Sequence, residues 1–194
     1  MGNPMRIGHP LEDRLKAPAS DILEAIHRAF RSVMNVKGQL AELYLYRKLQ
    51  ELEERGIISN LDWLDEDDKP DFFLEYKGKR LSIECKNVRD EIYKSDRKDQ
   101  YKKGWYKVET QKTRSGRDPV TGEQTRAYRV NRFHILAACL FNQTGEWQYL
   151  FCASRDLLRH PKLPDRLATF QPVPPTPQES WTDDLQAVLD KAIA

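Results

Sequence analysis

Residues 71–86 alternate apolar and polar side chains on both sides of Gly78, and this pattern strongly limits how the segment can fold. A period of two residues is typical of strands with one buried face. Gly78 suits the first central position of a type II′ turn, where φ is positive. With Gly78-Lys79 as a two-residue turn, the pattern predicts a hairpin whose apolar pairs include Phe72 opposite Cys85. That face is expected to belong to a hydrophobic core.

The opposite face of the predicted hairpin carries charged residues. In the same register Asp71 faces Lys86, and Glu84 lies two residues before Lys86 on the same strand. A slip of either strand by one residue would turn these charges into the core, because side chains alternate between the faces. The register that buries the apolar side chains is therefore expected to bring Asp71, Glu84 and Lys86 together.

Two carboxylates and one lysine are the groups that metal-assisted phosphodiester hydrolysis needs. Mg²⁺ prefers carboxylate oxygens, and a bound cation activates water and neutralises developing charge. We therefore predict a Mg²⁺ site, with Mn²⁺ as a substitute, held by Asp71 and Glu84 with Lys86 beside it. The alternative interpretation of the same three residues is a solvated sheet face with ordinary cross-strand ion pairs.

Other carboxylate-x-Lys triplets occur because 32% of the residues are charged. The triplet at residues 75–77 is rejected as the site because Lys77 borders the predicted turn. The triplets at residues 67–69 and 96–98 lie in polar runs with no apolar strand behind them. The pair formed by Asp71 and residues 84–86 is thus preferred.

Pro70-Asp71 followed by Glu84-Cys85-Lys86 resembles the motif of the PD-(D/E)xK nuclease superfamily, the fold of many restriction endonucleases and recombination nucleases. The resemblance covers roughly residues 38–153. It implies an α/β fold with a restriction-endonuclease-like core, in which helices flank a central mixed β-sheet. It also implies the backbone carbonyl of Cys85 as a further metal ligand.

The resemblance further implies that a glutamate on the first core helix points towards the metal site. Glu42 is the candidate, and a surface position is its alternative. In some families of the superfamily a glutamine follows the lysine and takes part in the site. Gln100 and Gln111 are the candidates, but neither has a distinctive spacing, and surface positions are the simpler interpretation.

Apolar periodicity and turn residues predict the order of elements and domains. Gly38 is expected to separate two helices, strands are expected on both sides of the turn at 142–145, and residues 113–125 are expected to form an exposed loop. We predict an extended N-terminal arm over residues 1–19, the nuclease domain over 20–168, and a Pro-rich linker with a C-terminal helix over 169–194.

A local excess of positive charge follows the predicted site. Residues 87–132 hold 13 Lys and Arg against 7 Asp and Glu, interleaved with tyrosines and a tryptophan, although the whole chain carries only +2. Basic side chains mixed with aromatic rings suit a phosphate backbone, so double-stranded DNA is the predicted partner. A solvated segment with snorkelling lysines is the alternative. The candidate DNA contacts are Arg114, Arg117, Arg126 and Arg129.

Several function classes lack support in the sequence. No apolar run is long enough to span a membrane, the N-terminus lacks the apolar core of a signal peptide, and the three cysteines show no metal-ligand spacing. A cytoplasmic protein with reduced thiols and no membrane partner is therefore predicted. The sequence contains no glycine-rich phosphate-binding loop, so it does not indicate ATP-driven activity.

The predicted function is a Mg²⁺-dependent DNA endonuclease, similar to type II restriction endonucleases. Because one chain supplies one site and a duplex has two strands, a homodimer is expected, with the N-terminal arm and the C-terminal helix as candidate interfaces. A structure-selective repair or recombination nuclease is the alternative with the same chemistry. A non-catalytic nucleic-acid-binding protein on the same fold is the alternative from another class.

Overall fold

The computed structural model describes residues 8–194 except for 65, 67–68, 97–101, 118–121 and 123. The chain divides into two compact units, residues 1–40 and 41–194, with helix α3 (Phe30–Glu54) running from the first into the second. This division differs from the expected boundaries after residues 19 and 168. Within the described residues, no helix combines the length and the apolar character that crossing a membrane requires.

The described part of the first unit is largely helical, and α1 lies within residues 1–19, where an extended arm was expected. It contains α1 (Pro10–Leu15), α2 (Ala19–Arg28) and the beginning of α3. The prediction of an extended arm was wrong for α1 because His9 and Glu12 form a reciprocal capping box around its first turn, with Pro10 at the first helical position. This capping satisfies backbone N–H groups that would otherwise lack partners.

Helix α3 continues through Gly38, so the predicted interruption was wrong. A glycine inside a helix costs about 1 kcal/mol relative to alanine, which a helix of 25 residues can sustain. In the second unit, α3 presents the buried residues Ala41, Leu45, Leu49 and Leu52 on one stripe.

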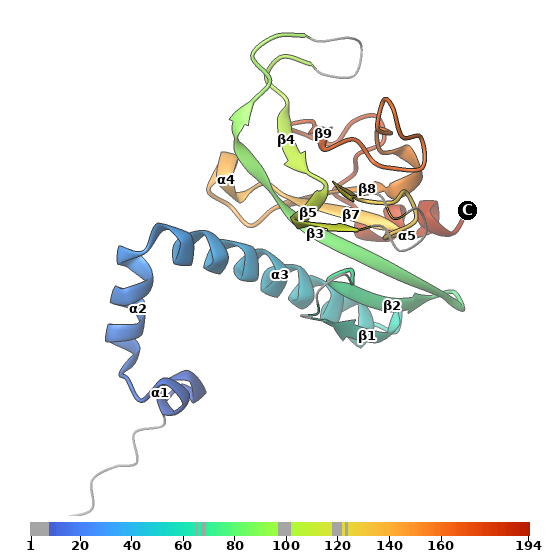
Figure 1. Cartoon of the computed structure of the whole chain (residues 1–194). Coiled ribbons are helices and arrows are strands. Elements are labelled where there is room, and N and C mark those ends of the chain that lie inside the picture. Colours follow the sequence, from blue (N-terminus) through green and yellow to red (C-terminus); the bar gives the residue numbers. More distant parts are fainter. Residues whose placement is uncertain (1–7, 65, 67–68, 97–101, 118–121, 123) are drawn as a thin grey trace, which may run out of the picture. The chain divides into compact units, whose positions relative to one another are not determined.

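The second unit is built on a seven-stranded mixed sheet (Figure 1). Its strands are β1 (Ser59–Trp63), β2 (Phe72–Tyr76), β3 (Lys79–Ile92), β4 (Tyr106–Glu109), β7 (Ile135–Cys139), β8 (Tyr149–Ala153) and β9 (Phe170–Val173). The order β1-β2-β3-β4-β9 is joined by β7, which pairs parallel to β3 and antiparallel to β8. The prediction of a mixed α/β fold with a central mixed sheet is confirmed.

The remaining elements are a separate hairpin of β5 (Gln111–Arg117) and β6 (Gln124–Ala127), the short helices α4 (Phe141–Thr144) and η1 (Ser154–Asp156), and α5 (Leu185–Ile193). The hairpin corrects the expectation of a loop over residues 113–125 in its described part.

Two hydrophobic clusters cover the two faces of the sheet. Successive residues of β7 alternate between them: Ile135 belongs to the cluster formed with α3 and α5, and Leu136 belongs to the cluster formed with β4 and β9. All five residues of β7 are buried. The continuous apolar run in the sequence therefore reflects a strand covered on both faces.

The register of the β2–β3 hairpin differs from the prediction. Tyr76 pairs with Lys79, so the two turn residues are Lys77 and Gly78, with φ of 49° and 73°. Positive φ at both central residues defines a type I′ turn, whose twist matches that of the flanking strands. The predicted type II′ turn at Gly78-Lys79 was therefore wrong.

The corrected register pairs Phe72 with Ile83 instead of Cys85. Continued by one residue, it places Asp71 level with Glu84, not with Lys86 as predicted. Because the shift amounts to two residues along one strand, every side chain keeps its face. The apolar and charged faces of the hairpin are therefore as predicted, although the predicted turn was wrong.

Residues 169–194 are part of the second unit and not a linker outside it. Strand β9 pairs antiparallel with β4, and Gln171, Pro172 and Val173 are buried. Proline is tolerated there because β9 lies at the edge of the sheet. Helix α5 is capped by Asp184 and buries Val188 and Leu189 in the core.

Candidate active site

Asp71 lies where β2 and β3 separate. The last β2–β3 pair joins Phe72 to Ile83; from Glu84 to Asn87 β3 pairs with β7, and β4 pairs with β3 only from Val88 onward. The backbone N–H of Cys85 donates a hydrogen bond of 2.6 Å to Oδ2 of Asp71. The carboxylate therefore takes the position that a strand partner would otherwise fill.

The same arrangement orients the carbonyl of Cys85. In an extended strand the N–H and C=O of one residue point to the same side. Because the N–H of Cys85 is directed to Asp71, its carbonyl is directed to that side as well, away from β7. The thiol lies in the core, where burial raises its pKa well above the usual range. A role for Cys85 is thus restricted to its backbone.

Glu84 is the buried carboxylate of the cluster, with its side chain 2% exposed. Its Oε1 lies 2.8 Å from Nζ of Lys86 and accepts a hydrogen bond of 2.9 Å from the hydroxyl of Tyr128. Its Oε2 is buried without a hydrogen-bond partner among the described residues, and Nε of Arg132 lies 4.0 Å from it. Because a buried charged oxygen without a donor is costly, a cation would stabilise this arrangement.

The electrostatics of Asp71 also favour a cation. Burial raises the pKa of Asp71 to about 7, and the lowering effect of Lys86 is offset by the negative charges of Glu84 and Glu42. A divalent cation between the carboxylates would relieve both the burial and the repulsion.

Lys86 remains charged in this environment. Burial works to lower the pKa of its ammonium group, but the carboxylates of Glu84 and Asp71 outweigh it and raise the pKa above the ordinary value. Nζ of Lys86 lies 4.0 Å from Oδ2 of Asp71. Lys86 can therefore act as a fixed positive charge and not as a base.

Glu42 lies on α3 and belongs to the surroundings of the cluster. Its Oε2 accepts a hydrogen bond of 3.1 Å from Nε1 of Trp63, and its charge contributes to the raised pKa of Asp71. Gln111 is placed differently, because its side-chain amide donates to Glu109. Gln100 lies outside the described residues, as do Arg97 and Lys98 of the rejected triplet at 96–98.

The prediction from the sequence did not include Tyr128 and Arg132, two residues that lie next to Glu84. Tyr128 figured only among the aromatic residues of the basic region, and Arg132 was absent from the candidate arginines. The guanidinium carbon of Arg132 lies 4.4 Å from the centre of the Tyr128 ring, and Nη2 donates a hydrogen bond of 3.1 Å to the carbonyl of Lys69. Both residues come shortly before β7, the parallel neighbour of β3, and this adjacency could have identified them.

The four arginines predicted to contact DNA differ in what the structure describes of them. Arg126 lies 3.8 Å from a carboxylate oxygen of Glu109, and Arg129 lies 3.4 Å from one of Asp165. Arg114 and Arg117 belong to β5, but their side chains lie outside the described part of the structure. Contact of any of them with DNA stays a prediction.

The donor set fits a hard cation that retains water. Among the described residues no three His, Cys, Asp or Glu side chains form a metal centre. Asp71 and Glu84 offer two carboxylates, and Cys85 offers a carbonyl. Mg²⁺ is commonly bound through one or two carboxylates while keeping several waters, so this set suits Mg²⁺.

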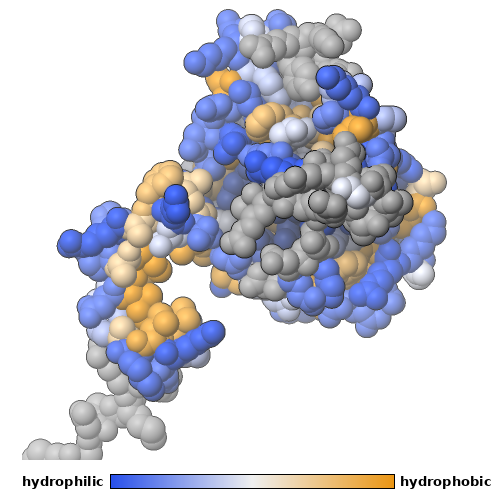
Figure 2. Space-filling view, in the orientation of Figure 1, coloured by the Kyte–Doolittle hydropathy of each residue, from blue (hydrophilic) through white to orange (hydrophobic). Residues whose placement is uncertain are grey.

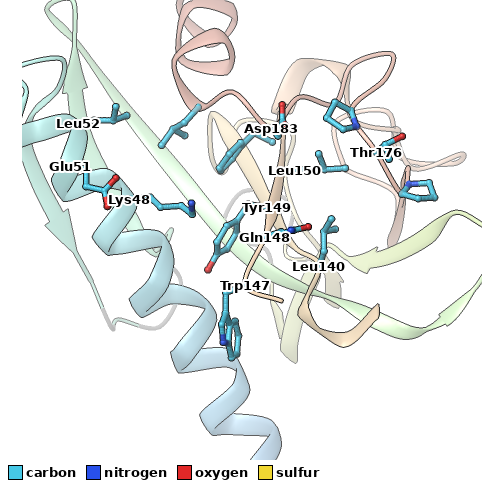
Figure 3. Close-up of a pocket in the computed structure, with 14 residues that line it drawn as sticks. Lys48, Glu51, Leu52, Leu140, Trp147, Gln148, Tyr149, Leu150, Thr176 and Asp183 are labelled. Carbon is cyan, nitrogen blue, oxygen red and sulfur yellow. The ribbon is translucent and has the colours of Figure 1, made fainter. Parts of the chain in front are cut away.

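Figure 3 shows a pocket of about 530 Å³ in the second unit. It is lined by residues of α3, β8 and the segment before α5, including Lys48, Trp147, Tyr149 and Asp183. None of Asp71, Glu84 and Lys86 lines it. Pocket size therefore does not identify the candidate site, which is defined by its charges.

Comparisons with known proteins add one distant likeness. No protein-family model matches the sequence, and no curated protein matches it. A solved structure of a bacterial homing endonuclease is similar over 66% of this chain and 80% of its own, with 16% sequence identity and a TM-score of 0.39. At this TM-score nothing about function is concluded from the likeness.

Proposed function

We propose that this protein is a Mg²⁺-dependent DNA endonuclease of the PD-(D/E)xK type, and specifically a type II restriction endonuclease. The observation that supports the proposal is the buried Oε2 of Glu84, which has no hydrogen-bond donor among the described residues. Oε1 of the same carboxylate lies 2.8 Å from Nζ of Lys86, which in turn lies 4.0 Å from Oδ2 of Asp71. A solvated surface face, the alternative considered from the sequence, does not fit a glutamate whose side chain is only 2% exposed.

Each residue has a defined task in the proposed reaction. Asp71 and Glu84 would hold Mg²⁺, with the carbonyl of Cys85 as a further ligand. Bound Mg²⁺ would supply an activated water and neutralise charge on the phosphate. The ammonium of Lys86 would orient the attacking water and offset the negative charge that develops on the phosphate oxygens. Attack by water on phosphorus would break one P–O bond and leave 5′-phosphate and 3′-hydroxyl ends.

DNA as the substrate is supported by side chains near the end of β3. Cations lie over aromatic rings there, at 4.9 to 6.0 Å from the ring centres, in the pairs Lys102 with Trp105, Lys107 with Tyr93, and Arg89 with Phe170. Phe170 is exposed whereas Trp105 is buried, so the pair of Arg89 with Phe170 is the one best placed for contacts with phosphates and bases. The cytoplasm stays the predicted location.

The test is incubation of the purified protein with unmethylated duplex DNA of phage length, with Mg²⁺ or with EDTA. Discrete fragments that form only with Mg²⁺ are the expected result. If cleavage is confined to branched DNA, the proposed restriction function would give way to a structure-selective nuclease of repair or recombination. Binding without cleavage of linear, branched or single-stranded DNA would overturn the enzyme proposal in favour of a non-catalytic protein.

A further inference from the structure

A second pocket of the second unit, with a volume of about 210 Å³, is distinguished by its positive charge. Hydrophilic residues cover much of this unit in Figure 2, so the sign of the charges, and not hydropathy, identifies such a site. Three basic residues line the pocket, His134, Arg155 and Arg159, and all three are exposed. The other lining residues are uncharged: Val130, Asn131, Phe133, Ala153, Ser154 and Ala192. We call this site the basic pocket.

The positive charges of the basic pocket are not compensated there. No Asp or Glu lines it, and neither Arg155 nor Arg159 forms an ion pair with any residue that the structure describes. Asp156, the neighbour of Arg155 in the sequence, lies 2.7 Å from Nζ of Lys191 instead. An anion in the pocket would therefore be attracted by two guanidinium groups and would meet no carboxylate of the lining.

His134 contributes a neutral donor to the basic pocket. The backbone N–H of Ser82 donates a hydrogen bond of 3.0 Å to Nδ1 of His134, and Oγ of Ser82 lies 2.9 Å from the same nitrogen. Because a backbone N–H can only donate, Nδ1 carries no proton, and the ring proton is on Nε2. Burial of part of the ring lowers the pKa of His134 and favours this neutral form. Nε2–H is thus the group that the imidazole offers to a ligand.

The size of the basic pocket limits the kind of anion that it can hold. Pockets for drug-sized ligands have volumes of about 300–1,000 Å³, so a cavity of about 210 Å³ suits one small charged group. Arginine binds phosphate oxygens bidentately, and two arginines with one additional N–H donor suit a single phosphate.

The basic pocket adjoins the candidate active site. The residues on both sides of Arg132 line the pocket, whereas Nε of Arg132 lies 4.0 Å from Oε2 of Glu84. Ser82, which holds His134, comes two residues before Glu84 on β3, so the side chains of Ser82 and Glu84 share one face. Two residues of a strand span roughly 7 Å, which is comparable to the separation of successive phosphates along one DNA strand.

We propose that the basic pocket binds a backbone phosphate of DNA, the one next to the phosphate that is cleaved. Arg155 and Arg159 would neutralise this phosphate, and Nε2–H of His134 would donate to one of its oxygens. Contacts of this kind fix the register of a DNA strand without reading its bases, so they would place the cleaved phosphate over Asp71 and Glu84. The identification of the anion as part of a DNA substrate rests on the proposed function.

The first test measures the affinity for duplex DNA across a range of salt concentrations, with Ca²⁺ in place of Mg²⁺. The double variant Arg155→Ala, Arg159→Ala is expected to bind at least about 10-fold more weakly at low salt. The slope of log affinity against log salt should fall by about 1, the value for one lost phosphate contact.

The double variant Arg47→Ala, Arg55→Ala is the matched control, because it removes the same charge from two exposed arginines on and just after α3. Its salt slope should equal that of the wild type. Equal losses in both double variants, or an unchanged slope in the variant of the basic pocket, would overturn the proposal.

Duplexes with one uncharged methylphosphonate in place of one phosphate locate the contact. The replacement is moved one position at a time along the bound duplex. Next to the cleaved phosphate it should weaken binding by the wild type but not by the variant Arg155→Ala, Arg159→Ala, because the variant has already lost that contact. If no position differs between the two proteins, the pocket does not hold a backbone phosphate.

Titration calorimetry with inorganic phosphate separates DNA from a free anion as the source of the phosphate. Tight binding of inorganic phosphate that the double variant loses, with an unchanged affinity for the duplex, would overturn the proposal. Duplex that shows the expected methylphosphonate effect but is never cleaved with Mg²⁺ would overturn the proposed function and leave the phosphate contact standing. Mg²⁺-dependent cleavage without any such effect would overturn the contact and leave the function standing.

Discussion

The hydroxyl of Tyr128 donates a hydrogen bond of 2.9 Å to Oε1 of Glu84. Nζ of Lys86 lies 2.8 Å from the same oxygen, whereas Oε2 has no donor within hydrogen-bond distance among the described residues. The two contacts fix the rotation of the carboxylate, and in the proposed site Oε2, which lies 4.0 Å from Nε of Arg132, would hold the Mg²⁺ ion. Residues that orient metal ligands in this way commonly set metal affinity.

We predict that Tyr128→Phe raises the Mg²⁺ concentration needed for half-maximal cleavage by about 10- to 100-fold, because Glu84 loses the donor that fixes its carboxylate. The rate at saturating Mg²⁺ should change by no more than a few-fold. Cleavage rates measured across a Mg²⁺ titration provide the check.

Tyr76→Phe is the matched control for this variant. Tyr76 is also buried, and its hydroxyl donates a hydrogen bond of 2.8 Å to the carboxylate of Asp190. Tyr76 belongs to the hydrophobic cluster of α3 and α5, whereas Tyr128 belongs to the other cluster. Loss of the Tyr76 hydroxyl should lower stability without moving the Mg²⁺ midpoint. An equal shift in both variants would mean that Tyr128 acts only through stability.

The raised pKa of Asp71 predicts a pH-dependent stability of the metal-free protein. Burial raises this pKa from 3.8 to about 7, so the folded state binds the proton more tightly than the unfolded state. The resulting contribution to stability is fully present below about pH 4 and is lost as the pH rises through about 7.

Asp71→Asn removes this dependence. In EDTA at pH 8 the variant should be more stable than the wild type by up to about 4 kcal/mol, and near pH 4 the difference should vanish. Urea denaturation at both pH values measures it. Addition of Mg²⁺ at pH 8 should stabilise the wild type alone; a variant less stable than the wild type at pH 8 would contradict this account of Asp71.

Glu42 should influence the site mainly through its charge. Because this charge helps to raise the pKa of Asp71, Glu42→Gln should move the pH midpoint of Mn²⁺ binding to lower pH. Affinity at pH 8.5, where Asp71 is ionised in both proteins, should change less than 10-fold. Isothermal titration with Mn²⁺ across pH measures both quantities, and a larger loss at pH 8.5 would make Glu42 a direct ligand.

The type I′ turn predicts a stabilising substitution. Lys77 has a φ of 49°, a conformation that asparagine adopts more readily than lysine. Lys77→Asn should therefore stabilise the protein by about 0.5–1 kcal/mol, even though it removes the exposed ion pair with Asp190. Lys79→Asn is the control, because Lys79 is in β3. Stabilisation by Lys79→Asn alone would support the turn that the structure rejects.

The grouping of the candidate site residues was predictable from the sequence because it depends only on which face of the strand each side chain occupies. It does not depend on the exact pairing of the two strands. The turn was placed one residue too late, yet Asp71, Glu84 and Lys86 stayed on one face, since a shift of two residues preserves the alternation. The buried strands β7 and β8 were predictable from continuous apolar runs.

The features that were not predicted from the sequence depend mainly on contacts between distant parts of the chain. The hydrogen bond between Tyr128 and Glu84 joins residues 44 positions apart, and no local spacing indicates it. The prolines at positions 172, 174, 175 and 177 suggested a linker, but an edge position next to β4 allows a strand that includes the first of them. Capping by His9, an uncommon capping residue, concealed α1.

The central claim is that Asp71, Glu84 and Lys86 together hydrolyse DNA with Mg²⁺, and the most direct test compares the wild type with Lys86→Ala on one duplex substrate. Cleavage and DNA binding should be measured on the same protein samples, with binding followed in Ca²⁺. Lys86→Ala is expected to lose cleavage by at least about 1,000-fold, because the charge near the attacked phosphate is removed, while its DNA affinity stays within a few-fold. Cleavage by Lys86→Ala at the wild-type rate would contradict the assignment of this site.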